Sequence, residues 1–328
     1  GKKPVELVFY QTGNADWTEA DFMNHYGTYI QRKLPHITPK FVPVPPAKSM
    51  DGLIAAGQQF DVLLLSVGHT HLNLIRNGFQ YDISELVKQK NVDLTRFEPF
   101  AIDQQREIAG GGLYGLPLSN TSPVIMYNKD LFDKFGAPYP KDGMTWDQTY
   151  ELAKQLTRSD GGISYYGLLA SPEHVLKTNP FSAPFVDPKS SKPMFDDPKM
   201  MTFIENLKRF YMLIPPPGGK PLEGSFFSST GQSKMFAKER NLAMWVHFSN
   251  AAVNFPGDLN WDYASFPYFK ELGPVGPQAY PGYIYVSSTS KHKEDAMDAL
   301  LALTSDEFQT IRSKAGIETA LKHPDVKK

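Results

Sequence analysis

Apolar and polar positions along this 328-residue chain repeat with two different periods, which predict strands and helices in alternation. Short apolar runs at 5–10, 41–44 and 61–67 are typical of strands. The run DVLLLSV at 61–67 is apolar at nearly every position, as expected of a parallel strand that is covered on both faces. From Phe22 to Leu34, apolar residues recur every three or four positions and predict the buried face of a helix. The alternation therefore predicts an α/β protein with mostly parallel sheets.

Local signals fix where several of these elements begin. Thr18 and Asp21 have the spacing of a capping box, and Trp17 and Phe22 can pair as a hydrophobic staple around it. We also expect helices at 50–59, 72–77, 83–89, 97–107, 198–213, 233–240 and 293–303, and strands at 242–246, 263–266 and 283–287.

Composition narrows the class of protein. A chain of 328 residues that is 41% hydrophobic is long enough for two lobes with separate cores. With 34 basic and 35 acidic residues, the overall charge does not indicate a nucleic-acid-binding surface, although a local patch stays open. The chain has no cysteine, so a thiol nucleophile is excluded. It shows no signal peptide and no apolar run of membrane-spanning length, so we expect a mature or trimmed chain that has lost its export signal.

Four segments carry a resemblance to a known family. The first, at 113–157, is LYGLPLSNTSPVIMYNKDLFDKFGAPYPKDGMTWDQTYELAKQLT. The others are FAKERNLAMW at 236–245, WDYASFPYF at 261–269 and PGYIYVSSTSKHKEDAMDALLALTSDEFQTIRSKAG at 281–316. They resemble the carbohydrate-type extracellular solute-binding proteins of ABC importers (family 1, maltose-binding-protein-like), and the resemblance covers nearly the whole chain.

The resemblance implies an α/β, two-lobe periplasmic-binding-protein fold with hinge crossings and a ligand cleft between the lobes. By this analogy, residues 1–112 and 268–316 form the first α/β lobe, residues 113–267 form the second, and residues 317–328 form a C-terminal tail. Family members continue for several helices past the position of Gly316 and complete the second lobe with them. We therefore expect either a short variant or a fragment that lacks those helices.

The implied function is capture of a carbohydrate, an oligosaccharide or a modified sugar, outside the cell membrane and its delivery to the permease subunits of an ABC importer. Such a protein is not an enzyme, needs no cofactor, binds no nucleic acid and is a monomer. It is either a cell-surface lipoprotein, held by a lipid anchor that is absent from this sequence, or free in the periplasm. Two alternatives stay open: a carbohydrate-active enzyme, which generally needs two carboxylates across one cleft, and a binding protein for a peptide, polyamine or metal.

Sugar sites combine aromatic faces with amide, hydroxyl and carboxylate groups, and in α/β lobes they lie in loops after strands. The loop after the first strand offers Asn14, Asp16 and the ring of Trp17. Packing against Phe22 as the hydrophobic staple explains Trp17 equally well. For Asp16 the alternative is a solvated position in a turn.

The second place is SVGHTH at 66–71, directly after the apolar strand. Ser66 and His69 can hydrogen-bond a ligand, and Gly68 lets it approach the backbone closely. His69 and His71 can also chelate a metal, but no third ligand is visible, so we expect no metal site.

The third place is LPLSNTSP, where Ser119 and Asn120 correspond to a ligand-contacting position of the resembling family. Trp146 opens a helix that Thr145 and Gln148 cap, and it either shields a sugar or packs at the helix start.

The fourth place joins Trp245 and His247 to Gly282 and Tyr283. In the resembling family these strands place an aromatic ring and a glycine turn near ligand, and we expect Trp245 to stack on the sugar, with core packing as its alternative. Strand alternation puts Val246 on the opposite face.

The run GGGLYG at 110–115 formally matches a dinucleotide-binding loop. A helix must follow such a loop, whereas Leu116-Pro117 follows here, so we expect a hairpin turn instead.

Overall fold

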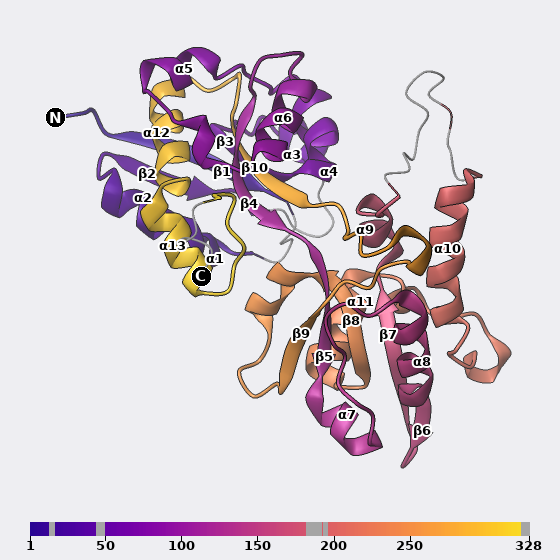
Figure 1. Ribbon diagram of the computed structural model, residues 1–328. Coiled ribbons are helices and arrows are strands. Elements are labelled where there is room, and N and C mark those ends of the chain that lie inside the picture. Colours follow the sequence, from indigo (N-terminus) through magenta and orange to yellow (C-terminus); the bar gives the residue numbers. More distant parts are fainter. Residues whose placement is uncertain (13–16, 44–49, 182–191, 193–195, 323–328) are drawn as a thin grey trace. The chain divides into compact units, whose positions relative to one another are not determined.

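The computed structural model describes residues 1–12, 17–43, 50–181, 192 and 196–322, which belong to two compact units (Figure 1). Unit 1 comprises Gly1–Thr121 and Tyr280–Lys328, and unit 2 comprises Ser122–Ala279. The chain passes from unit 1 to unit 2 after Thr121 and returns at Tyr280.

Unit 1 is built on a five-stranded sheet with the order β2-β1-β3-β10-β4. Strand β1 is parallel to β2 and β3, and β10 is antiparallel to both of its neighbours, so β4 points the same way as β1 and β3. The strands are β1 (Val5–Gln11), β2 (Ile37–Phe41), β3 (Val62–Ser66), β4 (Gly115–Thr121) and β10 (Tyr280–Val286). The helices are α1 (Glu19–Phe22), α2 (Thr28–Lys33), α3 (Met50–Ala55), α4 (Val67–His69), α5 (Ser84–Gln89), α6 (Pro99–Ile108), α12 (Lys293–Leu303) and α13 (Asp306–Lys314).

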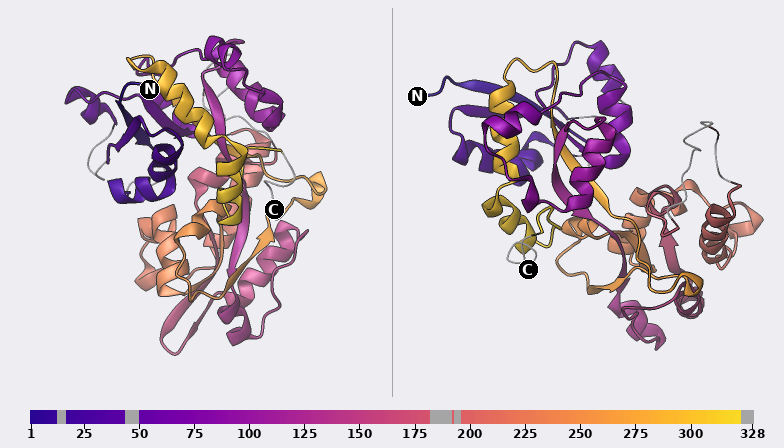
Figure 2. Two further views of the ribbon diagram at one scale, coloured as in Figure 1. Left: turned by 90° about the vertical axis from the view of Figure 1, so that its left-hand side faces the viewer. Right: turned by 45° about the horizontal axis from the view of Figure 1, so that its top comes forward.

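Hydrophobic residues cover both faces of this sheet, as the apolar run in β3 predicts. Val62 and Leu64 belong to the core cluster on one face, and Leu63 and Leu65 to the cluster on the other. Helix α12 packs on β10 and α2 within the first of these layers (Figure 2). The sheet edge formed by the strand ends is thereby held between two packed layers.

Unit 2 has a second five-stranded sheet, with the order β6-β7-β8-β5-β9. Strands β7 and β8 are parallel, whereas β5 is antiparallel to both β8 and β9. The strands are β5 (Pro123–Asn128), β6 (Arg158–Asp160), β7 (Ile163–Ala170), β8 (Leu242–Phe248) and β9 (Trp261–Ser265). The helices are α7 (Lys129–Phe135), α8 (Trp146–Leu156), α9 (Pro172–Lys177), α10 (Pro198–Tyr211) and α11 (Ser229–Lys234). Both sheets are therefore mixed, and the expectation of mostly parallel sheets is wrong for unit 2.

The two predicted capping boxes are present. The backbone N–H of Thr18 donates to Asp21 Oδ2 at 2.8 Å, and Asp21 N–H donates to Thr18 Oγ1 at 3.2 Å. Thr145 and Gln148 make the equivalent pair at 2.9 and 3.1 Å. These caps satisfy N–H groups that a helix start otherwise leaves unpaired, so both helices begin where the sequence predicts.

The glycine run at 110–115 does not form the expected hairpin. Gly110 and Gly111 have φ angles of 61° and 100°, and Gly111 N–H donates to Arg106 O at 2.7 Å, which ends α6 in a left-handed turn. Strand β4 follows directly. Because glycine adopts positive φ freely, the run serves as a helix C-terminus rather than a strand turn.

The boundaries of the units differ from those expected at 112/113 and 267/268. Because β4 pairs with β10 in the sheet of unit 1, the first segment of unit 1 extends to Thr121. The backbone of Tyr268 pairs with Thr145, so the chain beyond the expected boundary at 267/268 still belongs to unit 2, which ends at Ala279. Leu321, expected in a C-terminal tail, pairs with Phe97 and is fully buried in unit 1.

Candidate functional site

One edge of the unit 1 sheet collects several of the predicted site residues. Because β1, β3 and β4 point the same way, their carboxyl ends meet at the edge where β10 begins. In register, Gly282 of β10 lies opposite Ser66 on one side and Ser119 on the other, and Pro281 lies opposite Asn120. The structure thus brings Ser66, Ser119, Asn120 and Gly282 together from three strands that are distant in sequence.

Gly282 keeps space open at this edge. A Cβ atom added there would lie 2.8 Å from Ser119 Oγ, closer than side chains approach in folded proteins. Beside it, the hydroxyls of Ser66 and Tyr280 lie 3.5 Å apart. The glycine therefore leaves the Ser119 hydroxyl uncovered from this side, as close ligand approach requires.

Three neutral polar atoms at the same edge are buried, and the described residues supply none of them with a hydrogen-bond partner. They are Gln11 Nε2, Thr12 Oγ1 and Asn120 Oδ1, and we call them the edge polar atoms. A buried polar group without a partner costs about 1–3 kcal/mol, so such groups usually face a ligand or an ordered water. Sequence reasoning selected Asn120 but missed Gln11 and Thr12, whose signal is their place at the end of β1.

The remaining unit 1 candidates have different surroundings. The indole of Trp17 stacks on the His25 ring, with centroids 4.5 Å apart, and packs against the core cluster that contains Phe22. Tyr283 is fully buried, and its hydroxyl donates to Ala101 O at 3.1 Å. Both rings therefore have packing roles in this structure.

Two other candidates of unit 1 lie in a short helix, and two lie outside the described residues. Gly68 and His69 follow β3 in the short helix α4 and are half-buried. Asn14 and Asp16 lie outside the described residues.

In unit 2, β8 carries Trp245 and His247 on one face and Val246 on the other, as predicted from alternation. Trp245 is only 1% exposed, and its Nε1–H donates to Gln232 Oε1 at 3.0 Å. The His247 ring stacks on the indole, with centroids 4.7 Å apart and planes 17° apart. Because His247 covers the indole, this structure favours core packing for Trp245 and places His247 next to the strand end.

His247 is a neutral hydrogen-bonding group. Burial, with a smaller contribution from nearby His174, lowers the pKa of His247 to about 3. The two imidazole rings meet edge to face, with centroids 4.8 Å apart. Among the described residues, Nδ1 of His247 has no hydrogen-bond partner, so it can bond a hydroxyl of a ligand. The sequence predicted His247 as a hydrogen-bonding candidate, but β8 continues past the predicted strand end at 246 and includes His247.

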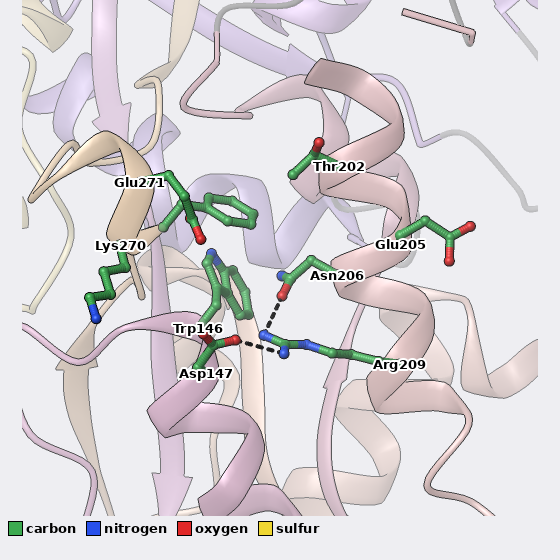
Figure 3. A pocket seen from close by; sticks show the side chains of 9 residues that line it. Trp146, Asp147, Thr202, Glu205, Asn206, Arg209, Lys270 and Glu271 are labelled. Carbon is green, nitrogen blue, oxygen red and sulfur yellow. Dashed lines mark hydrogen bonds and ion pairs between the residues drawn. The ribbon is translucent and has the colours of Figure 1, made fainter. Parts of the chain in front are cut away.

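Trp146 is the first residue of α8. It is 1% exposed and packs edge to face on Phe210 and Phe266, with centroids 5.7 and 5.2 Å apart. It lines a cavity within unit 2 (Figure 3). The structure therefore gives Trp146 a packing role and a place beside a separate cavity.

The described part of the chain contains no group of three or more His, Cys, Asp or Glu side chains placed to hold a metal ion. Over the same residues, no helix has the length and apolar character needed to cross a membrane.

Residues 14–310 match the model of a family described as bacterial extracellular solute-binding protein. Among curated proteins, the sn-glycerol-3-phosphate-binding periplasmic protein UgpB of Brucella abortus (strain 2308) is 33% identical over 73 residues. That segment is 22% of this chain and 16% of the relative.

Solved structures of low sequence identity have the same fold. The ABC substrate-binding protein Lmo0181 from Listeria monocytogenes, in complex with cycloalternan, aligns with a TM-score of 0.76 at 19% identity over 100% of this chain and 82% of that one. The GacH receptor of Streptomyces glaucescens GLA.O, solved unliganded and with acarbose, aligns with a TM-score of 0.73 at 16% identity over 99% and 83%. These likenesses confirm the predicted two-lobe periplasmic-binding-protein fold.

Proposed function

We propose a carbohydrate cargo for this chain, which belongs to the family of bacterial extracellular solute-binding proteins. The observation that carries the proposal is the set of edge polar atoms, which are an amide N–H, a hydroxyl and an amide oxygen at one sheet edge. A sugar presents an array of hydroxyls that each donate and accept, which is the complement of such a set. Relatives of the same fold are described in complex with cycloalternan and acarbose, which supports the same class.

The charge of the site favours a neutral sugar over a phosphorylated one. The residues that end β1, β3 and β4 and begin β10 include no lysine or arginine. Phosphate recognition usually uses cationic side chains or a helix N-terminus. The glycerol-3-phosphate of the UgpB relatives is therefore the less suitable cargo for this edge.

Each residue of the proposed site has a defined part in binding. Asn120 Oδ1 accepts a hydrogen bond from a sugar hydroxyl, and Gln11 Nε2 donates one to a sugar hydroxyl. Ser66 and Ser119 flank the space that Gly282 leaves open. Within unit 2 taken by itself, the neutral His247 offers Nδ1 to a ligand hydroxyl. Asn14, Asp16, Gly68 and His69 stay in the proposed site because they follow the same strand ends in the chain. Trp17 does not, because its ring packs on His25 and the core.

The wider role follows from the family. The loaded protein delivers its cargo to the permease of an ABC importer on the outer side of the cell membrane, and it acts as a monomeric carrier rather than an enzyme. Closure of the two lobes on the sugar by a hinge and attachment through a lipid anchor are parts of the same proposal.

A thermal-shift screen tests the cargo class. The purified chain is heated with neutral mono- and oligosaccharides, including maltose and mannobiose, and with glycerol-3-phosphate, peptides and metal ions. A ligand that binds only the folded state raises the melting temperature with its concentration. A shift with neutral sugars supports the proposal. A shift with glycerol-3-phosphate, peptides or metals and none with sugars overturns it.

A further inference from the structure

A cavity of about 290 Å³ lies within unit 2, between the start of α8, the middle of α10 and the short turn Lys270–Leu272. Trp146 and Phe269 form its apolar walls. Figure 3 shows the side chains of Asn206 and Arg209 extending from α10 toward Trp146. The volume is at the lower end of the range for small-molecule sites.

Three of the side chains that line this cavity each carry an N–H donor that is buried without an acceptor from the described residues. The donors are Trp146 Nε1, Asn206 Nδ2 and Arg209 Nε, and we call them the cavity nitrogens. Trp146 is 1% exposed and Asn206 is 7% exposed, so neither side chain is bathed in bulk water. Because burying a donor costs free energy unless it is bonded, three of them around one cavity indicate an occupant with acceptor oxygens.

The positions of the donors are fixed by their neighbours. Arg209 donates from Nη1 to Asp147 Oδ1 and from Nη2 to Asn206 Oδ1, both at 2.7 Å. The second bond assigns the oxygen of the Asn206 amide and leaves its NH2 group on the other side. The backbone N–H of Trp146 donates to Tyr268 O at 3.0 Å, which fixes the start of α8 beside the turn.

The charges around the cavity select a neutral occupant. The Arg209 guanidinium is already paired with Asp147. Glu271 and Lys270 also line the cavity, and Figure 3 shows the Glu271 side chain directed toward Trp146, whereas those of Lys270 and Glu205 point away from it. An anion beside Trp146 would be repelled by the Glu271 carboxylate. A hydroxyl can accept from a cavity nitrogen and donate its own proton to Glu271, whereas a purely cationic ligand gives the N–H groups nothing to bond.

We propose that this cavity is a second binding site for a small neutral polyol or monosaccharide, held by the cavity nitrogens in unit 2 alone. The site shares no residue with the edge polar atoms or with His247, so it does not depend on the proposed cargo site.

The indole N–H signals of a ¹⁵N-labelled full-length chain test this proposal directly. The chain has 4 tryptophans, and the Trp146→Phe variant identifies the Trp146 signal. D-Mannitol, a linear neutral polyol, is titrated into the protein, with sodium sulfate in a parallel titration. We expect the Trp146 signal to move saturably with mannitol and not with sulfate. The Trp245 signal serves as an internal reference because its N–H is already bonded to Gln232.

Variants separate a built site from simple hydration. Asn206→Asp keeps the oxygen that accepts from Arg209 but removes a donor, and we expect it to weaken mannitol binding at least five-fold. Glu205→Gln is the matched control on the same helix, because Figure 3 shows the Glu205 side chain pointing away from Trp146; we expect a change of less than two-fold. Asn120→Ala should leave the Trp146 titration unchanged.

Several results would overturn the second site. If the indole N–H signal of Trp146 does not move when mannitol is added to the wild-type chain, the cavity holds water only. A response to sulfate in place of mannitol contradicts a neutral ligand. A response that disappears in Asn120→Ala means that Trp146 reports binding at the edge polar atoms, in which case the cargo proposal survives and the second site does not.

Discussion

Replacing Gln232 by methionine tests the packing that positions the proposed ligand-binding face of unit 2. Gln232 is fully buried, and its Oε1 accepts from Trp245 Nε1 at 3.0 Å. Its Nε2 donates to Phe226 O at 2.8 Å and to Tyr211 Oη at 3.2 Å. Because His247 stacks on Trp245, this amide helps to fix the ring that we place against the sugar.

The expected cost follows from these contacts. Methionine has a similar shape and volume, so little is lost in packing. Phe226 O keeps the bond from Tyr211 Oη at 3.1 Å, whereas the N–H of Trp245 loses its acceptor. One buried, unpaired donor costs about 1–3 kcal/mol, so Gln232→Met should lower the free energy of unfolding by about 2 kcal/mol. Adding Trp245→Phe removes that donor, so the double variant should lose about 1 kcal/mol less than the sum of the single variants.

Urea unfolding followed by tryptophan fluorescence is the appropriate assay, because Trp146, Trp245 and Trp261 all belong to unit 2. The matched control is Gln155→Met, since Gln155 is exposed on α8. The reasoning is refuted if Gln232→Met and Gln155→Met unfold at the same urea concentration, or if the two buried substitutions are simply additive.

Three further predictions concern single residues. Asn120→Ala should weaken binding of the neutral sugar by about three- to ten-fold, the worth of one hydrogen bond, without lowering the melting temperature of the free protein. Gly167→Ala should lower the free energy of unfolding by about 3 kcal/mol, because its Cβ would lie 2.7 Å from the carbonyl carbon of Ala153 in α8. The low pKa of His247, about 3 against an ordinary 6.5, means that the unfolded chain binds more protons between those pH values. Stability should therefore fall by up to about 1.4 kcal/mol per unit as the pH drops through this window, and His247→Phe should flatten the curve.

Each of these three has its own check. Calorimetric titration measures the first, and an unchanged affinity removes Asn120 from the site. Gly224→Ala is the control for Gly167→Ala, since the same added atom would meet nothing within 4 Å there. Urea unfolding at pH 4 to 7 measures the third, and equal slopes for wild type and His247→Phe would show that His247 does not carry the pH dependence.

Local sequence signals predicted local structure well. The capping boxes at Thr18 and Thr145 and the helix Lys293–Leu303 depend on residues a few positions apart, and the structure confirms all three. The glycine run at 110–115 was misassigned because positive φ angles suit a helix end as well as a strand turn.

Features that depend on distant parts of the chain were beyond sequence reasoning. Strand alternation places Trp245 and Val246 on opposite faces of β8. Because other residues cover both faces, alternation does not indicate which side chain contacts a ligand. The edge polar atoms come together because β10 inserts between β3 and β4 from far along the chain. The burial of Gln11 Nε2 and Thr12 Oγ1 is a consequence of that arrangement rather than of their neighbours in the sequence.

The most direct test of the account is calorimetric titration of the chain with the neutral sugar that gives the largest thermal shift, followed by recovery of the sugar. The account predicts saturable one-to-one binding, weakened by Asn120→Ala, with the sugar recovered unchanged. Absence of binding to every neutral sugar while another class of ligand binds, or recovery of a cleaved sugar, would contradict it.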